Sequence, residues 1–347
     1  MSTLPGYLTA APHTFLELDT QLEGALRQGD LALWELHGVE PAGDIDAAMT
    51  LMRIHDLHLA PIGLLSGAER WQHHPAVSEI KCRLESEYLI GIEALDAQQG
   101  WNLPTDTIAA FRALSALDRV PAIYEWLATE ASDVELRQFI ALEGGPDGGF
   151  DDLVAICQIG LDGEPKLELA RNYWDEMGRG DRDGVHTTLH QRMSEALRVT
   201  PVARCRQPLQ ALQRSLLGSM LATNRWLQPE MIGALGLIEL QAGPRCRQVV
   251  TALDRLGSAS PSRPFYEEHA NVDPRHGKSW LDNVIVPLAD SNPEMATRML
   301  RGARWRWLVN ARFLDALKNG SGRLLDEGHR CLACLRHAWR EHPSQAR

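Results

Sequence analysis

Apolar residues recur along most of the chain at the three- and four-residue intervals of an α-helix, and strand-like alternation is scarce. Two helix starts carry specific signals. Ser132 and Glu135 have the spacing of a capping box, which predicts a helix running toward residue 145. The tripeptide that begins at Asn292 combines a cap, a first-turn proline and an acid, and predicts a helix to about Lys318. The pattern therefore predicts an all-α protein.

The spacing of helix-breaking residues changes near residue 100. Residues 1–100 form short helical patterns, and a composition break follows at Gln98-Gln99-Gly100 and Pro104. We therefore expect an N-terminal helical extension over residues 1–100 and one helical domain over residues 101–347. The helices of the extension have apolar faces that need covering, either by the second domain or by the partner subunit of a homodimer.

A triplet of polar residues on one helix face departs most clearly from this patterning. In RPFYEEHANVDPRHGKSW, His269, Asp273 and His276 occupy positions i, i+4 and i+7, so their directions span only about 60° and they lie on an apolar side. Two imidazoles and a carboxylate that converge in this way are typical of a metal site. The alternative is a surface helix with a salt bridge. Pro274 predicts either a kink at Asp273 or a regular helix that begins only there.

Two further polar residues lie on helix faces that are otherwise apolar. Glu143 lies seven residues after Leu136 on the apolar face of the capping-box helix, where an ionised carboxylate is costly unless it is paired or bound to metal. Alternatively, Glu143 ends that helix and reaches water. His186 lies on a stripe with Leu189 and Met193, and its alternative interpretation is an ordinary core histidine.

For two acids between these segments, the helical repeat does not decide whether the side chain faces the core. Pro165 opens a helix over KLELARNYWDEMG, in which Glu176 shares a stripe with Leu169 and Tyr173. Asp183 lies three residues before a histidine and could reach the same side. The main apolar face of the helix holds other residues: Leu167, Ala170, Trp174 and Met177.

Together these residues make three histidines and three or four carboxylates, more ligands than the four that a zinc ion usually takes. A mixed set of imidazoles and carboxylates suits iron or manganese instead. Ferritin-like diiron bundles use Glu-x-x-His motifs, and the sequence contains none. The pair His55-Asp56 is found in HD-type phosphohydrolases, but the apolar segment that follows it offers no further ligands.

The composition excludes several other classes of protein. Apolar residues make up 44% and charged residues 23% of the 347 residues, which is ordinary for a globular chain. The net charge of −11 disfavours binding to nucleic acid or to an anionic membrane. No apolar run approaches the ~20 residues of a membrane span, the N-terminus lacks the pattern of a secretory signal, and the six cysteines form no framework. We therefore expect a cytoplasmic protein.

The candidate ligands, taken in order, resemble the pattern of the haem-oxygenase-like diiron oxidases and oxygenases. That pattern comprises a first glutamate, a glutamate with a histidine ten residues later, and a closing His-x-x-x-Asp-x-x-His: Glu143; Glu176 and His186; His269, Asp273 and His276. The phrase NYWDEMGRGD is similar to segments of iron-containing redox enzymes. The resemblance covers roughly residues 104–340. The chain departs from many members of the family by having Asp183-x-x-His186 in place of Glu-x-x-His, so the resemblance implies a shorter acid, Asp183, as a further ligand.

The resemblance implies a haem-oxygenase-like bundle of about seven helices, with an extra N-terminal helical region, that holds two Fe²⁺ ions and activates dioxygen. An external electron donor and a small-molecule substrate would take part. An extra carboxylate at Glu176 resembles the N-oxygenase branch, which implies oxygenation of an amino-acid-like amine in natural-product biosynthesis. Oxidative C–C cleavage, decarboxylation or desaturation is the alternative at the same centre. A non-catalytic helical binding protein, which would take up no iron, is the alternative from another class.

Overall fold

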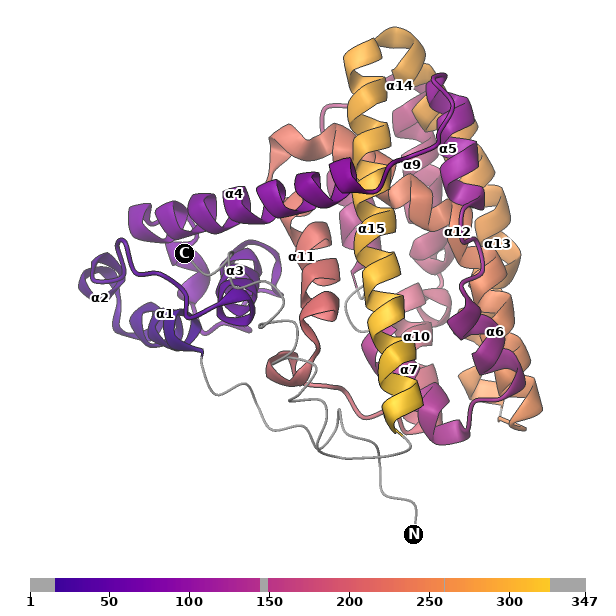
Figure 1. Cartoon of the computed structure of the whole chain (residues 1–347), viewed down its shortest axis with the longest axis horizontal. Helices are drawn as coiled ribbons and strands as arrows, with labels where there is room; N and C mark the ends of the chain where they lie inside the picture. The colour runs from indigo at the N-terminus through magenta and orange to yellow at the C-terminus, as the bar shows by residue number, and fades with distance from the viewer. Residues whose placement is uncertain (1–15, 144–148, 259, 325–347) are drawn as a thin grey trace. The chain divides into compact units, whose positions relative to one another are not determined.

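The computed structural model describes residues 16–143, 149–258 and 260–324, and these residues form helices and connecting turns without a β-strand (Figure 1). The prediction of an all-α protein is confirmed. The chain divides into two compact units: one contains the described residues up to Gln98, Val202–Thr223 and the described residues from Asn319 on, and the other contains Gln99–Pro201 and Asn224–Lys318. No helix in the described ranges combines the length and apolarity needed to cross a membrane.

The first unit is built around α3. Its helices are α1 (Glu17–Gln28), α2 (Asp30–Trp34), α3 (Asp44–Leu59), α4 (Pro75–Gln98) and α11 (Leu209–Thr223), with short 3-10 turns at Ala68–Trp71 and Arg204–Arg206. Helix α11 packs against α3, and Leu212 and Leu216 join the apolar core of this unit. The buried carboxylate of Asp46 accepts hydrogen bonds from the backbone N–H groups of Leu18 and Asp19, both at 2.9 Å, and so satisfies the start of α1.

The second unit contains the remaining helices: α5 (Thr107–Ala116), α6 (Ala122–Thr129), α7 (Asp133–Glu143), α8 (Phe150–Cys157), α9 (Gly163–Glu176), α10 (His186–Leu197), α12 (Gln228–Arg255), α13 (Pro264–Trp280), α14 (Val286–Ser291) and α15 (Pro293–Leu324). A π-helical turn at Leu281–Ile285 joins α13 to α14. Short 3-10 turns lie at Gly178–Gly180, Arg182–Gly184, Arg225–Leu227 and Ser260–Ser262.

Both predicted helix starts are confirmed. In α7, the backbone N–H of Ser132 donates to Glu135 Oε2 at 2.8 Å, and the N–H of Glu135 donates to Ser132 Oγ at 3.4 Å. Helix α15 starts at Pro293, where Asn292 Oδ1 accepts a hydrogen bond from the N–H of Glu294 at 2.9 Å. The helix is longer than predicted, because it continues beyond Lys318 to Leu324.

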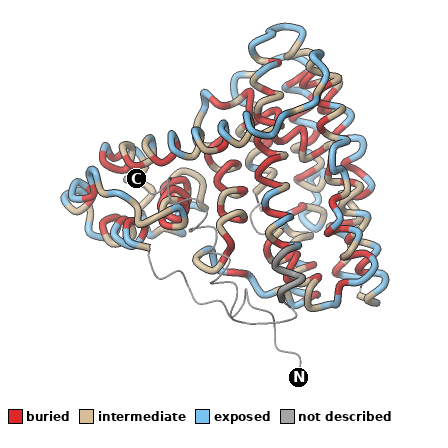
Figure 2. Tube along the Cα trace, viewed as in Figure 1, coloured by how far each residue is buried: buried red, intermediate tan, exposed pale blue. Residues whose placement is uncertain are grey.

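Helix α12 is the centre of the second unit: it packs along α13 (Figure 1), and its backbone also comes close to that of α15. Buried and exposed residues alternate along the helices (Figure 2). A Cβ atom on Gly277 of α13 would lie 2.8 Å from the carbonyl oxygen of Glu239, and one on Gly233 of α12 would lie 1.8 Å from the carbonyl oxygen of Met299. Both distances are far below van der Waals contact, so only glycine permits this approach. The close packing holds the residues of α12 and α13 in fixed register.

Helix α13 runs without interruption through Pro274, so it does not begin at Asp273. Proline has no N–H, and the carbonyl of Ala270, four residues earlier, therefore loses its partner within the helix. Arg247 of α12 donates to that carbonyl from Nη1 at 2.7 Å. The arginine thus offsets the lost hydrogen bond and ties α13 to α12 beside Asp273.

Candidate metal centre

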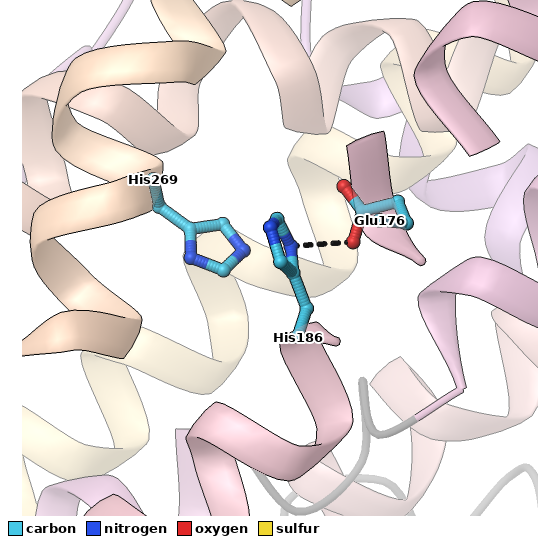
Figure 3. A group of neighbouring side chains, drawn as sticks. All are labelled: Glu176, His186 and His269. Carbon is cyan, nitrogen blue, oxygen red and sulfur yellow. Dashed lines mark ion pairs between the residues drawn. The ribbon is translucent and has the colours of Figure 1, made fainter. Parts of the chain in front are cut away.

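A first group of potential ligands forms where three helices meet in the second unit. Glu176 is the last residue of α9, His186 is the first residue of α10, and His269 lies midway along α13. One ligand atom from each lies within 4.8 Å of the other two. Figure 3 shows the two imidazole rings and the carboxylate turned toward a common space, with His186 Nδ1 2.6 Å from Glu176 Oε2. The structure therefore brings together residues that lie 93 positions apart in the sequence.

A second group lies beside the first and shares a member with it. Glu176, Glu239 of α12 and His276 of α13 are all buried, and their ligand atoms also lie within 4.8 Å of one another. His276 Nδ1 lies 3.7 Å from Glu239 Oε2. Glu176 belongs to both groups, so its carboxylate lies between two adjacent sets of donor atoms.

Asp273 lies next to the second group. Its residue is 2% exposed, its Oδ1 lies 4.0 Å from His276 Nδ1, and its Oδ2 is buried without a hydrogen-bond partner among the described residues. Donor atoms bound to one metal ion at about 2.1 Å lie roughly 3 to 4 Å apart. The spacing and the unpartnered oxygen therefore fit a metal ligand better than an ordinary buried hydrogen bond.

The loop between α9 and α10 explains how Glu176 and His186 meet. Met177 and Val185 form an isolated antiparallel bridge that closes the loop as a hairpin. At Gly178, φ is +61° and a Cβ would lie 2.5 Å from the carbonyl carbon of Gly184, so a glycine is required there. The hairpin places the end of one helix beside the start of the next, which helical periodicity does not predict.

Helix α9 turns its more polar face inward. Leu167 and Trp174 are 54% and 55% exposed, whereas Leu169, Asn172 and Glu176 are buried. The face that we predicted to be the main apolar one is therefore the outer face, and this prediction is wrong. The inward polar residues instead line the candidate metal centre.

Hydrogen bonds outside the two groups fix the histidine rings. His269 Nδ1 lies 2.6 Å from the carbonyl oxygen of Phe265; because that oxygen only accepts, Nδ1 carries the proton and Nε2 is left as the ligand atom. His276 Nε2 lies 2.8 Å from Asp175 Oδ2, which leaves Nδ1 as the ligand atom, and this Nδ1 has no hydrogen-bond partner among the described residues. A carboxylate or carbonyl behind the imidazole is the usual support for a metal-binding histidine.

The carboxylates of Glu239 and Asp175 accept hydrogen bonds from side chains outside the two groups. Asn172 Nδ2 donates to Glu239 Oε1 at 2.8 Å and leaves the other oxygen toward His276. Arg179 Nε donates to Asp175 Oδ1 at 2.6 Å. Burial alone would raise the pKa of Asp175, but its hydrogen bonds with Arg179 and His276 bring the pKa below the usual value. Asp175 therefore remains ionised and orients His276.

The electrostatics of the two groups indicate missing positive charge. Burial raises the pKa of Glu176 to about 7, and burial together with the charge of Glu176 raises that of Glu239 to about 7 as well. The pKa of Asp273 is raised well above its usual value by burial and then by Glu239. No lysine or arginine among the described residues pairs with these three carboxylates. Burying such acids together is unfavourable unless protons or metal ions neutralise them.

The imidazoles are suited to bind metal in their neutral form. The pKa of His269 is lowered to about 4, by burial first and then by the charge of His186. Burial also lowers the pKa of His186. Neutral imidazole nitrogens and ionised carboxylates form a mixed donor set that suits iron or manganese, and three carboxylates would balance most of the +4 charge of two ferrous ions.

Asp183 and Glu143, the other two predicted ligands, lie outside both groups. The side chain of Asp183 is 70% exposed and pairs with Arg192 Nη2 at 2.6 Å. Glu143, at the end of α7, is half-buried, and its Oε1 accepts a hydrogen bond from the hydroxyl of Tyr124 at 3.1 Å. Among the described residues, neither carboxylate joins the two groups.

Sequence reasoning missed Glu239, although a signal for it exists. Glu239 is the only charged residue between Glu230 and Arg245 in the long helix α12, within the apolar segment MIGALGLIELQAG. It is 3% exposed. A lone acid inside a long apolar segment is costly to bury and is therefore, like an acid beside a histidine, a candidate functional residue.

The pair His55-Asp56 belongs to the first unit, where both side chains have partners of other kinds. His55 is buried, with Nε2 2.8 Å from Glu85 Oε1 and Nδ1 2.7 Å from Ser219 Oγ. Asp56 pairs with Arg204. Among the described residues, neither belongs to a group of three potential ligands.

Comparison with known families identifies the region that carries these groups. Residues 137–311, just over half of the chain, match a family model described as iron-containing redox enzyme. The match spans Glu176 to His276 and therefore includes all six residues gathered in or beside the two groups. A search of curated proteins finds no match. The family resemblance and the haem-oxygenase-like helical bundle expected from the sequence are confirmed.

Proposed function

Because this chain belongs to the family of iron-containing redox enzymes, we propose that it is a non-haem diiron oxygenase or oxidase that activates dioxygen. The observation that carries this proposal is the position of Glu176, which belongs to both ligand groups. A carboxylate shared by two adjacent donor sets is suited to bridge two metal ions. His186 and His269 would complete one site, and Glu239 and His276 the other, with Asp273 beside them.

Bound iron would supply the electrons that reduce dioxygen, and the residues of this chain would hold the ions and control their surroundings. His269 and His276 are fixed by the carbonyl of Phe265 and by Asp175, so their ligand nitrogens keep their positions. Asn172 holds only one oxygen of Glu239. The other oxygen of that carboxylate would be left to hold a bound ion.

The proposed reaction is oxygenation of the amine nitrogen of an amino-acid-like substrate in a biosynthetic pathway, with electrons from an external donor. The support is chemical: the centre holds three buried carboxylates, and an additional carboxylate at the position of Glu176 resembles the N-oxygenase branch of the superfamily.

The test is anaerobic loading of the purified full chain with Fe²⁺, followed by rapid mixing with dioxygen in the presence and absence of candidate amino acids. We expect oxygen consumption that depends on iron, and a product that gains an oxygen atom. Loss of a carbon fragment would assign oxidative cleavage instead. No oxygen consumption above that of the iron-free protein would contradict the proposal. Asp183→Asn is a matched control, because Asp183 lies outside both groups.

A further inference from the structure

A pocket of about 370 Å³ opens beside the second ligand group. This volume lies near the lower end of the range of about 300–1,000 Å³ that is usual for small-molecule sites. Its walls come from α5 and the turn after it, from α12, and from α13 with the π-helical turn. A molecule in this pocket would be small.

The buried part of the pocket is acidic. Glu239 and Asp273 both line it, and both residues are at most 3% exposed. Both residues also lie in or beside the second ligand group, so the pocket borders the candidate metal centre. Leu240 and Leu281 add apolar wall between this acidic part and the exterior.

The exposed part of the pocket is basic. Arg112 of α5 and Arg119 of the following turn line it, and both are exposed. Within the described ranges, neither guanidinium makes a hydrogen bond or an ion pair. Lys278 also lines the pocket, but its charge is balanced by Asp282, whose Oδ2 lies 2.6 Å from Nζ. Two uncompensated positive charges therefore remain in the exposed part.

We propose, building on the proposed function, that this pocket binds the carboxylate of a small amino acid through Arg112 and Arg119. Guanidinium groups present planar pairs of donors that match a carboxylate. The substrate amine would then extend toward Glu239 and Asp273, where the buried acidic part complements a positive or hydrogen-bonding nitrogen. The distribution of charge along the pocket matches a zwitterion, whereas a phosphate would place two negative charges near two buried carboxylates.

The binding experiment compares amino acids with their amides. Isothermal titration calorimetry on the full chain, under argon and both with and without Fe²⁺, would use L-lysine, L-tyrosine and L-leucine, the amide of each, and inorganic phosphate. We expect at least one amino acid to bind about tenfold or more tightly than its amide, because the amide loses charge-assisted hydrogen bonds. Arg112→Ala and Arg119→Ala should each weaken binding of that amino acid by about tenfold.

Arg275→Ala is the matched control, because Arg275 is exposed on α13 and does not line the pocket. It should leave the affinity unchanged. The inference is overturned if no amino acid in the set binds, if acid and amide bind equally, if phosphate binds with the same dependence on the two arginines, or if both arginine variants bind like the wild type.

Iron uptake separates this inference from the proposed function. Arg112→Ala and Arg119→Ala should retain the iron content of the wild type, since neither arginine belongs to a ligand group. If the wild type binds no iron but still prefers acid to amide through the two arginines, the proposed function fails and the carboxylate pocket stands. If iron binds normally and the arginines have no effect on affinity, the pocket assignment fails alone.

Discussion

Helix α12 carries two buried glutamates that differ in how their charge is balanced. Glu230 is 0% exposed and receives two hydrogen bonds of 2.8 Å from Arg298, together with an ion pair from Arg301. Glu239, nine residues later and 3% exposed, receives a hydrogen bond from Asn172 and lies near Glu176 and Asp273. The first is neutralised by the protein itself, and the second lies among other acids.

The difference shows that burial of a charge does not by itself mark a functional site. Glu230 joins α12 to α15 through arginines and has a structural role, as most buried ion pairs do. Glu239 has no arginine or lysine partner among the described residues, and burial raises its pKa to about 7. A buried acid that lies among other acids without a basic partner is a candidate for a cation-binding residue.

The largest expected effect is on iron binding. His269→Ala removes a ligand of the first group, and His276→Ala removes one of the second, so each variant should lose at least one of two bound ions. Iron analysis after anaerobic loading measures this. Asp183→Asn, which removes an exposed carboxylate, should retain the full content. If both histidine variants bind as much iron as the wild type, the two groups are not metal sites, and the proposed difference in role between Glu230 and Glu239 fails.

The next effect concerns stability without metal. Glu230→Gln weakens the charge-assisted hydrogen bonds from Arg298 and Arg301, whose side chains are partly exposed, and should lower the free energy of unfolding by about 1.5–3 kcal/mol. Glu239→Gln in the metal-free protein removes a charge that lies among like charges, and should leave stability unchanged or raised. Urea denaturation at pH 7.5 compares them. An equal loss of unfolding free energy in Glu230→Gln and Glu239→Gln would contradict the proposed difference between the two glutamates.

A smaller effect is expected for the carboxylate behind His276. Asp175→Asn keeps the shape of the side chain but weakens its support of the imidazole, and should reduce metal affinity by about 10- to 100-fold. Competition with a chelator of known affinity measures the change. The circular dichroism spectrum should stay the same, and an affinity equal to that of the wild type would show that Asp175 does not orient the ligand.

The smallest predicted effect is the pH dependence of metal-free stability. The folded-state pKa of both Glu176 and Glu239 is raised to about 7, so their carboxyls stabilise the fold while protonated and cost stability as pH rises from about 4.5 through 7. The pKa of His269 is lowered to about 4, so its contribution has the opposite sign: it raises the free energy of unfolding as pH rises from about 4 to about 6.5.

Glu239→Gln isolates the contribution of its carboxyl. Unfolding free energies at pH 5.5 and pH 8 should differ less in this variant than in the wild type, by about 1 kcal/mol or more. An unchanged pH dependence would mean that Glu239 titrates normally.

The sequence predicted the features that depend on local periodicity. The all-helical class, the starts of α7 and α15, and the inward direction of Asp273 and His276 all follow from capping signals or from the 3.6-residue repeat. His186 lies on its predicted stripe, with Met193 also buried. Each of these can be judged within one helix.

Features that depend on contacts between helices were not predicted. The inward face of α9, which carries Glu176, is the more polar one, so the number of apolar residues on each face did not predict which side is buried. Glu239 lies on α12, far from any histidine in sequence, and reaches the centre because Gly277 lets α12 and α13 touch. The segment Val202–Thr223 joins the first unit because α11 packs on α3, a contact between residues more than 140 positions apart.

The most direct test of the central claim is the number of Fe²⁺ ions bound per chain in an anaerobic titration of the wild type and of Glu176→Ala. Because Glu176 is common to both ligand groups, we predict two ions per chain in the wild type and fewer than one in the variant. A single ion in the wild type, or two ions retained by Glu176→Ala, would contradict a pair of metals held by a shared carboxylate.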